Sequence, residues 1–313
     1  MSRITVFSIP KSFVGHIGII QRNALASWTR LGEGVQVILF GNDAGVAEVA
    51  REAGVEHVPD IERTEYGTPL VNSAFSLAAR MARNPLLCYA NADIMFTDDL
   101  LRAAASVRRR KFLMVGHRWN VDIIEPWDFS DPRWRKKLVS LAHYHGSLSR
   151  DNWIDYFVLP RDSKLTVLPP FAVGRPRWDN YLLFRCRQLG YPLIDATDVV
   201  TAVHQNHGYG HVPKGTGDLW YGPEADANIK LLGDESRRFT LLDATHKLTE
   251  AGLKKTTDLH YSQRRRSVYL VLHPRQKLLV KSILAVKAIL RRIGLGRLAR
   301  LMAVWGGHKV LKG

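Results

Sequence analysis

The stretch Leu86-Leu-Cys-Tyr-Ala-Asn91-Ala-Asp93-Ile-Met-Phe96 contains the pattern that decides the fold. Its first five residues are apolar without interruption, and a polar residue, a small residue and a carboxylate follow them. Such a run is typical of a strand in a parallel sheet that is covered on both faces. Ligands of these sheets bind beyond the carboxyl ends of the strands. We therefore expect a buried strand over 85–90 that delivers Asn91 and Asp93 to a ligand site.

Strand and helix patterns alternate on either side of this stretch. Short apolar runs rich in β-branched residues predict strands at 4–9, 35–40, 55–58, 85–90 and 112–116. Helical spacing of apolar residues occurs between them, at 17–31, 44–53, 70–82 and 98–107. The alternation predicts an α/β fold, a mostly parallel sheet with helices on both faces. No G-x-G-x-x-G or Walker loop occurs, which counts against dinucleotide and P-loop enzymes.

The second half of the chain has a more mixed pattern. Strand or extended patterns occur at 153–160, 166–173 and within 193–203, and a helix is predicted over 178–189. Residues 208–262 are polar and weakly patterned.

The positive charge of the chain is concentrated in its last part. The sequence has 313 residues and a formal net charge of +16. Of its 45 lysines and arginines, 13 follow Asp258, whereas none of its 29 acidic residues does, so the first 258 residues carry a net charge of only +3. The main part of the chain lacks the basic excess that is typical of nucleic-acid-binding proteins, and we expect no nucleic-acid partner.

The composition is that of an ordinary globular protein, with 46% apolar and 24% charged residues. Cys88 and Cys186 lie far apart and have no ligand at zinc-finger spacing, which favours free thiols in a reducing compartment. The sequence shows neither a leader pattern nor about 18 consecutive apolar residues. We therefore expect a cytoplasmic protein without a membrane span.

Asn91 and Asp93 are the first candidate ligand-binding residues. Residues two apart on an extended segment face the same way, so both side chains could hold one hydrated divalent cation. Carboxylate and water oxygens suit Mg²⁺ or Mn²⁺, and diphosphate oxygens can fill the remaining positions. The alternative is that the two residues only form a turn at the strand end or cap the next helix.

This arrangement resembles a GT-A-type nucleotide-sugar glycosyltransferase of the family 2 kind, in which a D-x-D motif ends a central strand and binds metal and sugar nucleotide. Here the motif is Asn91-Ala92-Asp93, so the first carboxylate is replaced. The resemblance covers roughly residues 3–212. It implies a GT-A (Rossmann-like) fold, a nucleoside-diphosphate sugar as donor, and direct binding of Mn²⁺ or Mg²⁺ by Asp93. Asn91 would contact the donor or a metal-bound water.

Further positions match the order of functional segments in such enzymes. The resemblance implies donor binding by the ends of the first two strands and by the helix that precedes the metal-binding strand. The candidate donor-binding residues are Ser8, Pro10, Asp43, Asn72, Asn91 and Asp93. On the acceptor side the resemblance implies Asp155, Trp178 and Asn180. Packing in loops is the alternative for each of these positions.

Asp179 lies where a helix pattern begins, in Arg177-Trp178-Asp179-Asn180-Tyr181. The resemblance implies that Asp179 is the general base, because GT-A transferases often place an acidic residue at the start of a helix beside the acceptor. The alternative is a capping role, since the helix dipole favours a carboxylate in the first turn. The sequence leaves both open.

Two histidines, His204 and His207, follow the last predicted strand. Neutral imidazole is a common metal ligand, and the resemblance implies a histidine that completes the metal site. His204 is the first candidate because it comes directly after the strand, and His207 is the second. An isolated histidine has packing as its alternative role.

The end of the chain has the pattern of a basic amphipathic helix. Its lysines and arginines from Lys277 to Arg292 fall within one arc of a helical projection, with apolar residues opposite. This pattern is typical of a helix that lies on an anionic membrane surface, and a helix docked on the main domain is the alternative. We expect peripheral contact with the inner face of the plasma membrane. The predicted organisation is a catalytic domain over 1–212, a polar extension over 213–262 and a basic helical tail over 263–313.

Together these features predict a metal-assisted glycosyltransferase that moves a hexosyl or related sugar to the hydroxyl of a glycan or lipid-linked acceptor, as in cell-surface glycan or glycolipid synthesis. Inverting and retaining chemistry stay open. One alternative is a nucleotidyltransferase, although Pro10–Gly18 only loosely resembles the required Gly-rich loop. The other is a non-catalytic protein that binds carbohydrate or a lipid surface.

Overall fold

The computed structural model describes residues 4–208 and 220–276 and five single positions beyond them. The chain divides into two compact units, 1–256 and 257–313. The predicted basic tail lies largely outside the described residues, so its helical pattern stays a prediction.

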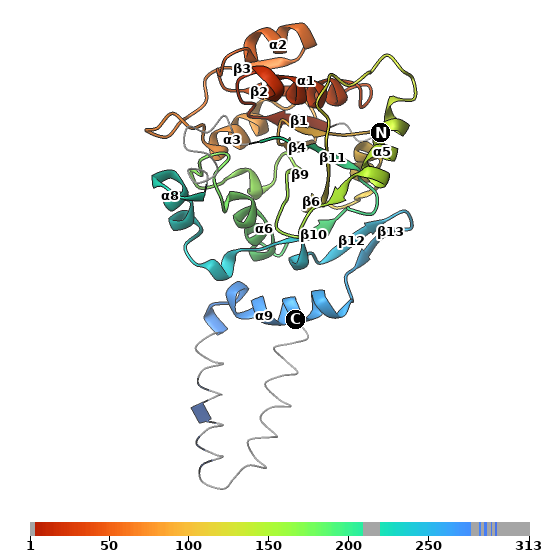
Figure 1. The fold of residues 1–313 in the computed structure, drawn as a ribbon. Coiled ribbons are helices and arrows are strands. Elements are labelled where there is room, and N and C mark those ends of the chain that lie inside the picture. Colours follow the sequence, from red (N-terminus) through yellow and green to blue (C-terminus); the bar gives the residue numbers. More distant parts are fainter. Residues whose placement is uncertain are drawn as a thin grey trace. The chain divides into compact units, whose positions relative to one another are not determined.

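A large sheet forms the centre of the first unit (Figure 1). In chain order its strands are β1 (Ile4–Ser8), β2 (Gln36–Phe40), β3 (Glu56–Val58), β4 (Leu86–Ala90), β6 (Leu113–Val115), β9 (Tyr156–Pro160), β10 (Leu193–Asp195), β12 (His246–Thr249) and β13 (Gly252–Lys255). Their order across the sheet is β13-β12-β10-β6-β9-β4-β1-β2-β3. Neighbours run parallel except where β9 pairs with β4 and β6 and where β13 pairs with β12. The predicted, mostly parallel sheet is confirmed.

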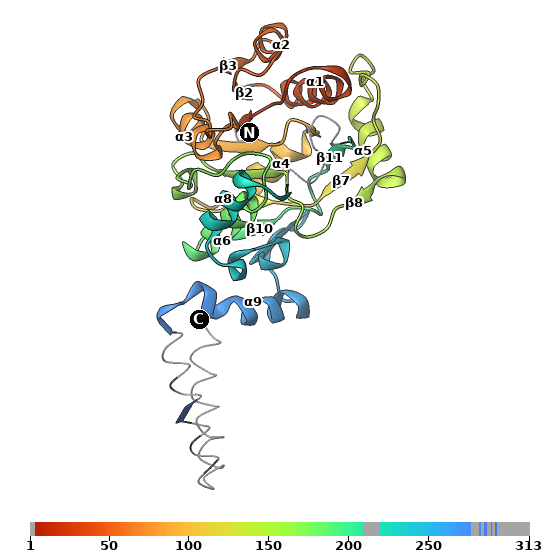
Figure 2. The ribbon, with the colours of Figure 1, turned by 60° about the vertical axis from the view of Figure 1, so that its left-hand side comes forward.

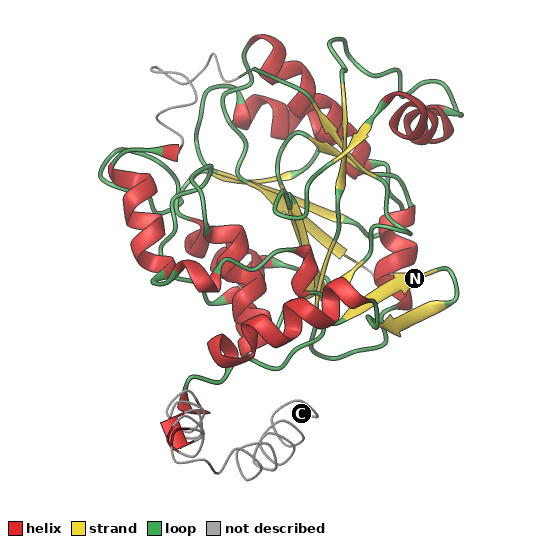
Figure 3. Cartoon of the chain, turned by 60° about the horizontal axis from the view of Figure 1, so that its bottom comes forward, coloured by secondary structure: helices red, strands yellow, loops and turns green. Residues whose placement is uncertain are grey.

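Helices cover both faces of this sheet, as Figure 3 shows. They are α1 (Gly15–Thr29), α2 (Val46–Ala53), α3 (Val71–Met81), α4 (Asp99–Ser106), α6 (Trp178–Gln188) and α8 (Pro223–Leu232). Alternating strand residues supply the two cores. Val6 belongs to the apolar cluster that includes Leu25 of α1, whereas Phe7 packs edge-on against Phe75 of α3. Phe75 in turn contacts Trp178, at the start of α6.

A smaller sheet lies beside the large one and positions the candidate site. Its strands, in spatial order, are β5 (Ile94–Met95), β11 (Ala202–Gln205), β7 (Arg118–Val121) and β8 (Ser147–Leu148). Helix α5 (Trp134–His145) packs against β7 (Figure 2). Trp28 of α1 donates its indole N–H to the carbonyl of Ile94 at 2.8 Å. The buried amide of Gln205 donates to the carbonyls of Ile20 and Asp93. Helix α1 therefore fixes the chain on both sides of the Asp93 carboxylate.

Several elements of the second half differ from the sequence expectation. The 166–173 stretch forms no strand; a short 3-10 helix (Lys164–Thr166) and an isolated bridge between Leu70 and Ala172 are found there. The polar segment over 213–262 contributes α8 and the β12–β13 hairpin to the first unit. The hairpin has little apolar pattern because β13 has no buried residue and β12 buries only Leu248. Helix α5, which buries Trp134, Leu138 and Ala142, also lay in a stretch without a predicted element.

The second unit contains α9 (Leu259–Leu272), which carries three consecutive arginines, Arg264–Arg266. Within the part of the chain that the structure describes, no helix is both long enough and apolar enough to cross a bilayer. In the first unit, Cys88 and Cys186 are buried free thiols, as the sequence favours.

Candidate active site

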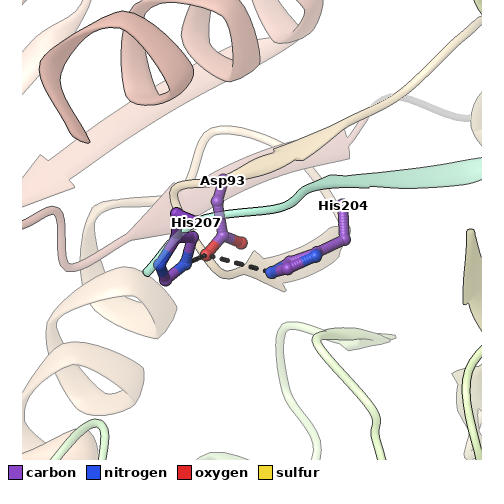
Figure 4. Close-up of side chains that lie close together, drawn as sticks. All are labelled: Asp93, His204 and His207. Carbon is purple, nitrogen blue, oxygen red and sulfur yellow. Dashed lines mark hydrogen bonds and ion pairs between the residues drawn. The ribbon is translucent and has the colours of Figure 1, made fainter. Parts of the chain in front are cut away.

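Asp93, His204 and His207 come together just beyond the end of β4 (Figure 4). Oδ2 of Asp93 lies 3.2 Å from Nε2 of His207 and 3.7 Å from Nε2 of His204. One potential ligand atom from each residue lies within 4.8 Å of the other two. The three residues that the sequence singled out as a metal set are therefore adjacent in space.

The pairing of two short strands explains why residues more than a hundred positions apart meet here. Strand β5 begins one residue after Asp93 and pairs antiparallel with β11, so that Ile94 is opposite His204. The backbone N–H of Gln205 also donates to the carbonyl of Asp93 at 3.3 Å. His207 follows β11 by two residues. From this loop its Nε2 forms a hydrogen bond with Oδ2 of Asp93. The register of β5 and β11 thus places both imidazoles at the carboxylate.

The surroundings set the protonation states of this cluster. Burial raises the pKa of the Asp93 carboxyl, but contacts with His204 and His207 and the charge of Arg118 outweigh it and hold the pKa below its ordinary value. Burial lowers the pKa of His204, against the opposing charge of Asp93. The carboxylate is therefore ionised and the His204 imidazole neutral at pH 7. These are the protonation states in which the two groups bind a metal ion.

Two properties of the cluster suit a divalent cation: the types of its ligand atoms, and the buried polar atoms that have no hydrogen-bond partner. Oδ1 of Asp93 and Nδ1 of His204 are buried and have no hydrogen-bond partner among the described residues. A buried polar atom without a partner costs free energy, and a metal ion or its water would satisfy the carboxylate oxygen. One carboxylate and two imidazoles suit Mn²⁺ better than Mg²⁺, which prefers oxygen ligands alone.

Asn91 belongs to a different contact from Asp93. Residues 92 and 93 form a turn instead of extended chain, so the alternation of an extended segment does not apply to Asn91 and Asp93, and a cation held by both stays a prediction. The Asn91 amide donates to Oδ1 of Asp155 at 2.5 Å. Oδ2 of Asp155 accepts from Arg118 at 2.5 Å. Asn91 thus links the metal-binding turn to the acceptor-side carboxylate that the sequence had proposed.

A cavity of about 230 Å³ lies on the Asn91 and Asp155 side of this turn. The lining residues are Asn91, Arg118, Asn152, Trp153, Ile154, Asp155, Gly174, Arg175, Pro176, Arg177, Trp178, Asp179, Asn180, Trp220 and Arg238. All three predicted residues at the start of α6 are among them. Trp178 is largely committed to the aromatic core, and the Asn180 amide donates to the carbonyl of Phe239. Of the three residues at the start of α6, Asp179 is therefore the candidate for a chemical role.

Asp179 has the proton affinity of a base that works near neutral pH. Burial raises its pKa from 3.8 to about 6, and the charge of Asp155 adds to that effect. Backbone N–H groups of Asp179 and Asn180 and the charge of Arg177 oppose the rise. A carboxylate with a pKa close to the working pH is well matched to proton abstraction.

The remaining predicted donor residues lie outside the cavity. The Ser8 hydroxyl is buried and donates to the carbonyl of Ala90 at 2.6 Å, which ties β1 to β4. Pro10 follows β1 and is buried. Asp43 accepts from Arg63, and Asn72 donates to Glu62 at 3.5 Å. Their binding of a donor stays a prediction.

The sequence reasoning did not find the basic residues of the cavity. Arg118 reaches it from β7, and Arg175, Arg177 and Arg238 surround the start of α6. Arg175 and Arg177 stand four and two residues before Asp179 in the sequence, and this proximity to the candidate base was the available signal. Arg118 and Arg238 gave none, because only the folded chain brings them to the cavity.

The fold is thus α/β, with a carboxylate and imidazole cluster at the end of a central strand. Neither a family model nor a curated protein matches the sequence. Among solved structures, similar chains include glucosyl-3-phosphoglycerate synthase from Mycobacterium tuberculosis with Mg²⁺ and uridine diphosphate, at a TM-score of 0.44 and 14% identity over 76% of this chain and 79% of that one.

The same enzyme with Mn²⁺, UDP-glucose and phosphoglyceric acid matches at a TM-score of 0.45 and 15% identity, over 75% of this chain and 79% of that one. Both matches have TM-scores below 0.5 and identities of 15% or less, so the description of the fold rests on the topology of this chain itself. At such similarity they do not decide the function, which rests on the site itself.

Proposed function

We propose that the protein is a metal-assisted glycosyltransferase that moves a sugar from a nucleoside-diphosphate sugar to an acceptor hydroxyl. One observation carries the proposal. A metal-binding set, Asp93 with His204 and His207, is joined through the Asn91 turn to a cavity that contains Asp179, a carboxylate with a pKa near 6. Sugar transfer from a diphosphate needs these two functions, charge neutralisation at the leaving group and a base at the nucleophile.

Asp93, His204 and His207 would hold Mn²⁺ or, less well, Mg²⁺. When bound, the ion would supply positive charge to a diphosphate leaving group. Lys11 follows β1 by three residues and would offer a second cation for the same phosphate oxygens. Burial lowers its pKa, and the charge of Asp93 opposes that shift.

Asp179 would take the proton of the acceptor hydroxyl. The acceptor oxygen then forms its bond to the anomeric carbon, the bond from that carbon to the diphosphate oxygen breaks, and the diphosphate leaves with the electron pair. Attack from the face opposite the leaving group inverts the anomeric centre, so we propose an inverting enzyme. Asp155 would orient Asn91 and Arg118, which line the same cavity.

Release of nucleoside diphosphate from a panel of UDP-, GDP- and dTDP-sugars with Mn²⁺ tests the function. The wild type should release the diphosphate, Asp93→Ala should lose metal-linked nucleotide binding, and Asp98→Asn, an exposed carboxylate paired with Arg102, should behave as wild type. Release of pyrophosphate would favour a nucleotidyltransferase. Binding of sugars without any release would favour a non-catalytic carbohydrate-binding protein.

The finer predictions concern the acceptor and the location. We propose a glycan or lipid-linked acceptor, as in cell-surface glycan synthesis, at the inner face of the plasma membrane. The supporting observation is the charge of the chain, because the 13 basic residues after Asp258 have no acidic neighbours in sequence. Each basic residue near an anionic surface contributes about 1 kcal/mol to binding.

A further inference from the structure

The cavity beside Asp179 is lined by more arginines than carboxylates. Arg118, Arg175, Arg177 and Arg238 line it, together with the carboxylates of Asp155 and Asp179. Arg118 is paired with Asp155. Arg175 donates from Nε and Nη2 to Glu224, a buried residue of α8 outside the cavity lining.

Arg177 keeps both of its terminal NH₂ groups without a described partner. Its side chain is only 16% exposed, and its Nε donates to Glu235 at 3.0 Å. Among the described residues, no acceptor contacts its terminal Nη1 or Nη2. A guanidinium has five N–H donors in a fixed fork that matches a carboxylate or phosphate. Because Arg177 lines the cavity, its terminal NH₂ groups are available to a ligand there.

The backbone at Arg177 supports a role beyond packing. Its φ of 86° and ψ of −19° are left-handed, and among the described residues other than glycine no other φ is positive. Glycine takes this conformation without steric cost, whereas a residue with a Cβ does not. Strained residues of this kind cluster at ligand-binding sites. An arginine at a position better suited to glycine indicates that its side chain is needed.

We infer that this cavity binds an acceptor that carries a carboxylate or a phosphate, and that Arg177 recognises this group while Asp179 faces the reacting hydroxyl. That the ligand is the acceptor of sugar transfer rests on the proposed function, whereas binding of an anion by Arg177 does not. Trp153, which is 41% exposed and lines the cavity, has Arg118 and Arg150 over its ring, so the aromatic residue of this wall also has cations beside it.

The diphosphate of the donor is the competing anion, and the geometry separates the two. Asp93, His204 and His207 do not line the cavity, whereas Arg177 and Asp179 do. A diphosphate bound through the metal cluster is therefore held by residues other than Arg177 and Asp179. The anion at Arg177 is a second one.

The test uses the full chain and three variants. Arg177→Gly removes the guanidinium and relieves the left-handed strain, so it should fold with an unchanged or higher Tm. Arg177→Gln removes the charge alone. Arg83→Gln is the matched control, because Arg83 also pairs with one glutamate, Glu56, but lies outside the cavity.

Calorimetry with glucose 6-phosphate and glucuronate, and with glucose as the neutral control, gives the main readout. The wild type and Arg83→Gln should bind the anionic sugars and not glucose. Both Arg177 variants should bind them roughly 10–100-fold more weakly, because a charge-assisted hydrogen bond is lost. Vesicles that contain phosphatidic acid form a second arm, and an effect of Arg177 on these alone would place the anion on a lipid.

Three results would overturn the inference. Equal binding of glucose and glucose 6-phosphate, or equal affinities in wild type and Arg177→Gly, would remove the anion site. Loss of UDP and Mn²⁺ binding in Arg177→Gly would assign the arginine to the donor. If the wild type binds no nucleotide while Arg177 still controls binding of glucose 6-phosphate, the proposed function fails and the anion site stands.

Discussion

Asn91 stands where an amide is required and a carboxylate would not fit. Its side chain donates to Oδ1 of Asp155, which is only 8% exposed and already holds Arg118 at its other oxygen. A carboxylate at position 91 would face Asp155 across the same short contact and repel it. An amide in place of the first acidic residue of the D-x-D pattern is therefore explained by the Asp155 carboxylate, which directly precedes β9.

Exchanging the two groups tests this explanation. We expect Asn91→Asp to destabilise the fold by about 1–3 kcal/mol, because it replaces a hydrogen bond by a charge repulsion. In Asn91→Asp with Asp155→Asn the donor and acceptor exchange places, and part of the loss should return. Urea unfolding of the two single variants and the double variant gives the coupling energy. Additive effects would show that the contact contributes nothing.

Asp179 offers a prediction that links stability to catalysis. The fold raises its pKa from 3.8 to about 6, so the ionised form is less favourable in the folded than in the unfolded chain. This cost is fully present above about pH 6 and disappears as the pH falls toward 3.8. Asp179→Asn should therefore unfold at a higher Tm than wild type at pH 7.5, with a smaller difference at pH 4.5.

The same substitution should lower turnover by about 10²–10⁴-fold with little change in donor affinity, since only proton transfer is lost. In the wild type, kcat/KM should fall as the pH drops through about 6, where the base becomes protonated. Turnover and donor affinity measured side by side distinguish a base from a helix cap. A variant with wild-type turnover would leave Asp179 only its capping role.

The candidate metal residues could be predicted from sequence because each lies at or close to the end of a strand. Asp93 comes soon after an uninterrupted apolar run, and His204 and His207 belong to the polar segment at the end of the last predicted strand. The cavity arginines were not predictable in the same way. A surface arginine and a cavity arginine have the same local pattern, and only the tertiary fold tells Arg118 or Arg238 from the rest.

At the scale of elements, α8 fixes one wall of the cavity. Glu224, in its first turn, accepts hydrogen bonds from Thr64, Thr68 and Arg175. Asn228, one turn later, bonds both the N–H and the carbonyl of Ala172. The helix thus joins the 64–68 loop to the chain segment that carries the cavity arginines.

Breaking this junction should loosen both loops. We expect Glu224→Gln to cost about 1–3 kcal/mol, because a buried charged acceptor of several hydrogen bonds is lost. The pKa of Glu224 lies below its ordinary 4.5 despite burial, owing to the two threonine hydroxyls and Arg175. Its contribution is therefore present above pH 4.5 and lost as the pH falls below that value.

Hydrogen exchange at residues 64–68 and 172–176, together with Tm, measures the effect. Glu52→Gln, at an exposed pair with Arg22, is the control and should change stability by less than about 0.5 kcal/mol. Faster exchange in both variants, or in neither, would contradict the assignment of Glu224 as the junction.

The elements that could be predicted from sequence are those with an uninterrupted apolar run or with a regular helical spacing of apolar residues. Strands β1, β2 and β4 are buried along nearly their whole length, so their apolar runs were unambiguous. Helix α8 and the β12–β13 hairpin bury few side chains, and their stability comes from hydrogen bonds to loops and from a sheet edge that was already formed. Patterns of local hydrophobicity do not record such long-range support.

At the scale of the whole molecule, charge and compactness divide the chain at nearly the same place. The first compact unit ends at Thr256, and the last acidic residue is Asp258. Thr256 is held within the first unit, where its N–H and hydroxyl donate to the carbonyls of Thr245 and Ala244. A cut after Thr256 therefore removes a strongly basic segment and leaves the candidate active site and its supporting contacts intact.

We expect the chain truncated after Thr256 to keep its Tm and its metal-linked nucleotide binding but to lose co-sedimentation with anionic vesicles. The full chain should bind such vesicles more tightly as the anionic lipid content rises and more weakly as salt is added, because exposed charges are screened over about 10 Å at 0.1 M salt. Vesicles of neutral lipid are the control. Sedimentation of the truncated chain would show that the segment is not the anchor. Unfolding of the truncated chain would show instead that residues after 256 are part of the core, and the docked-helix alternative would hold.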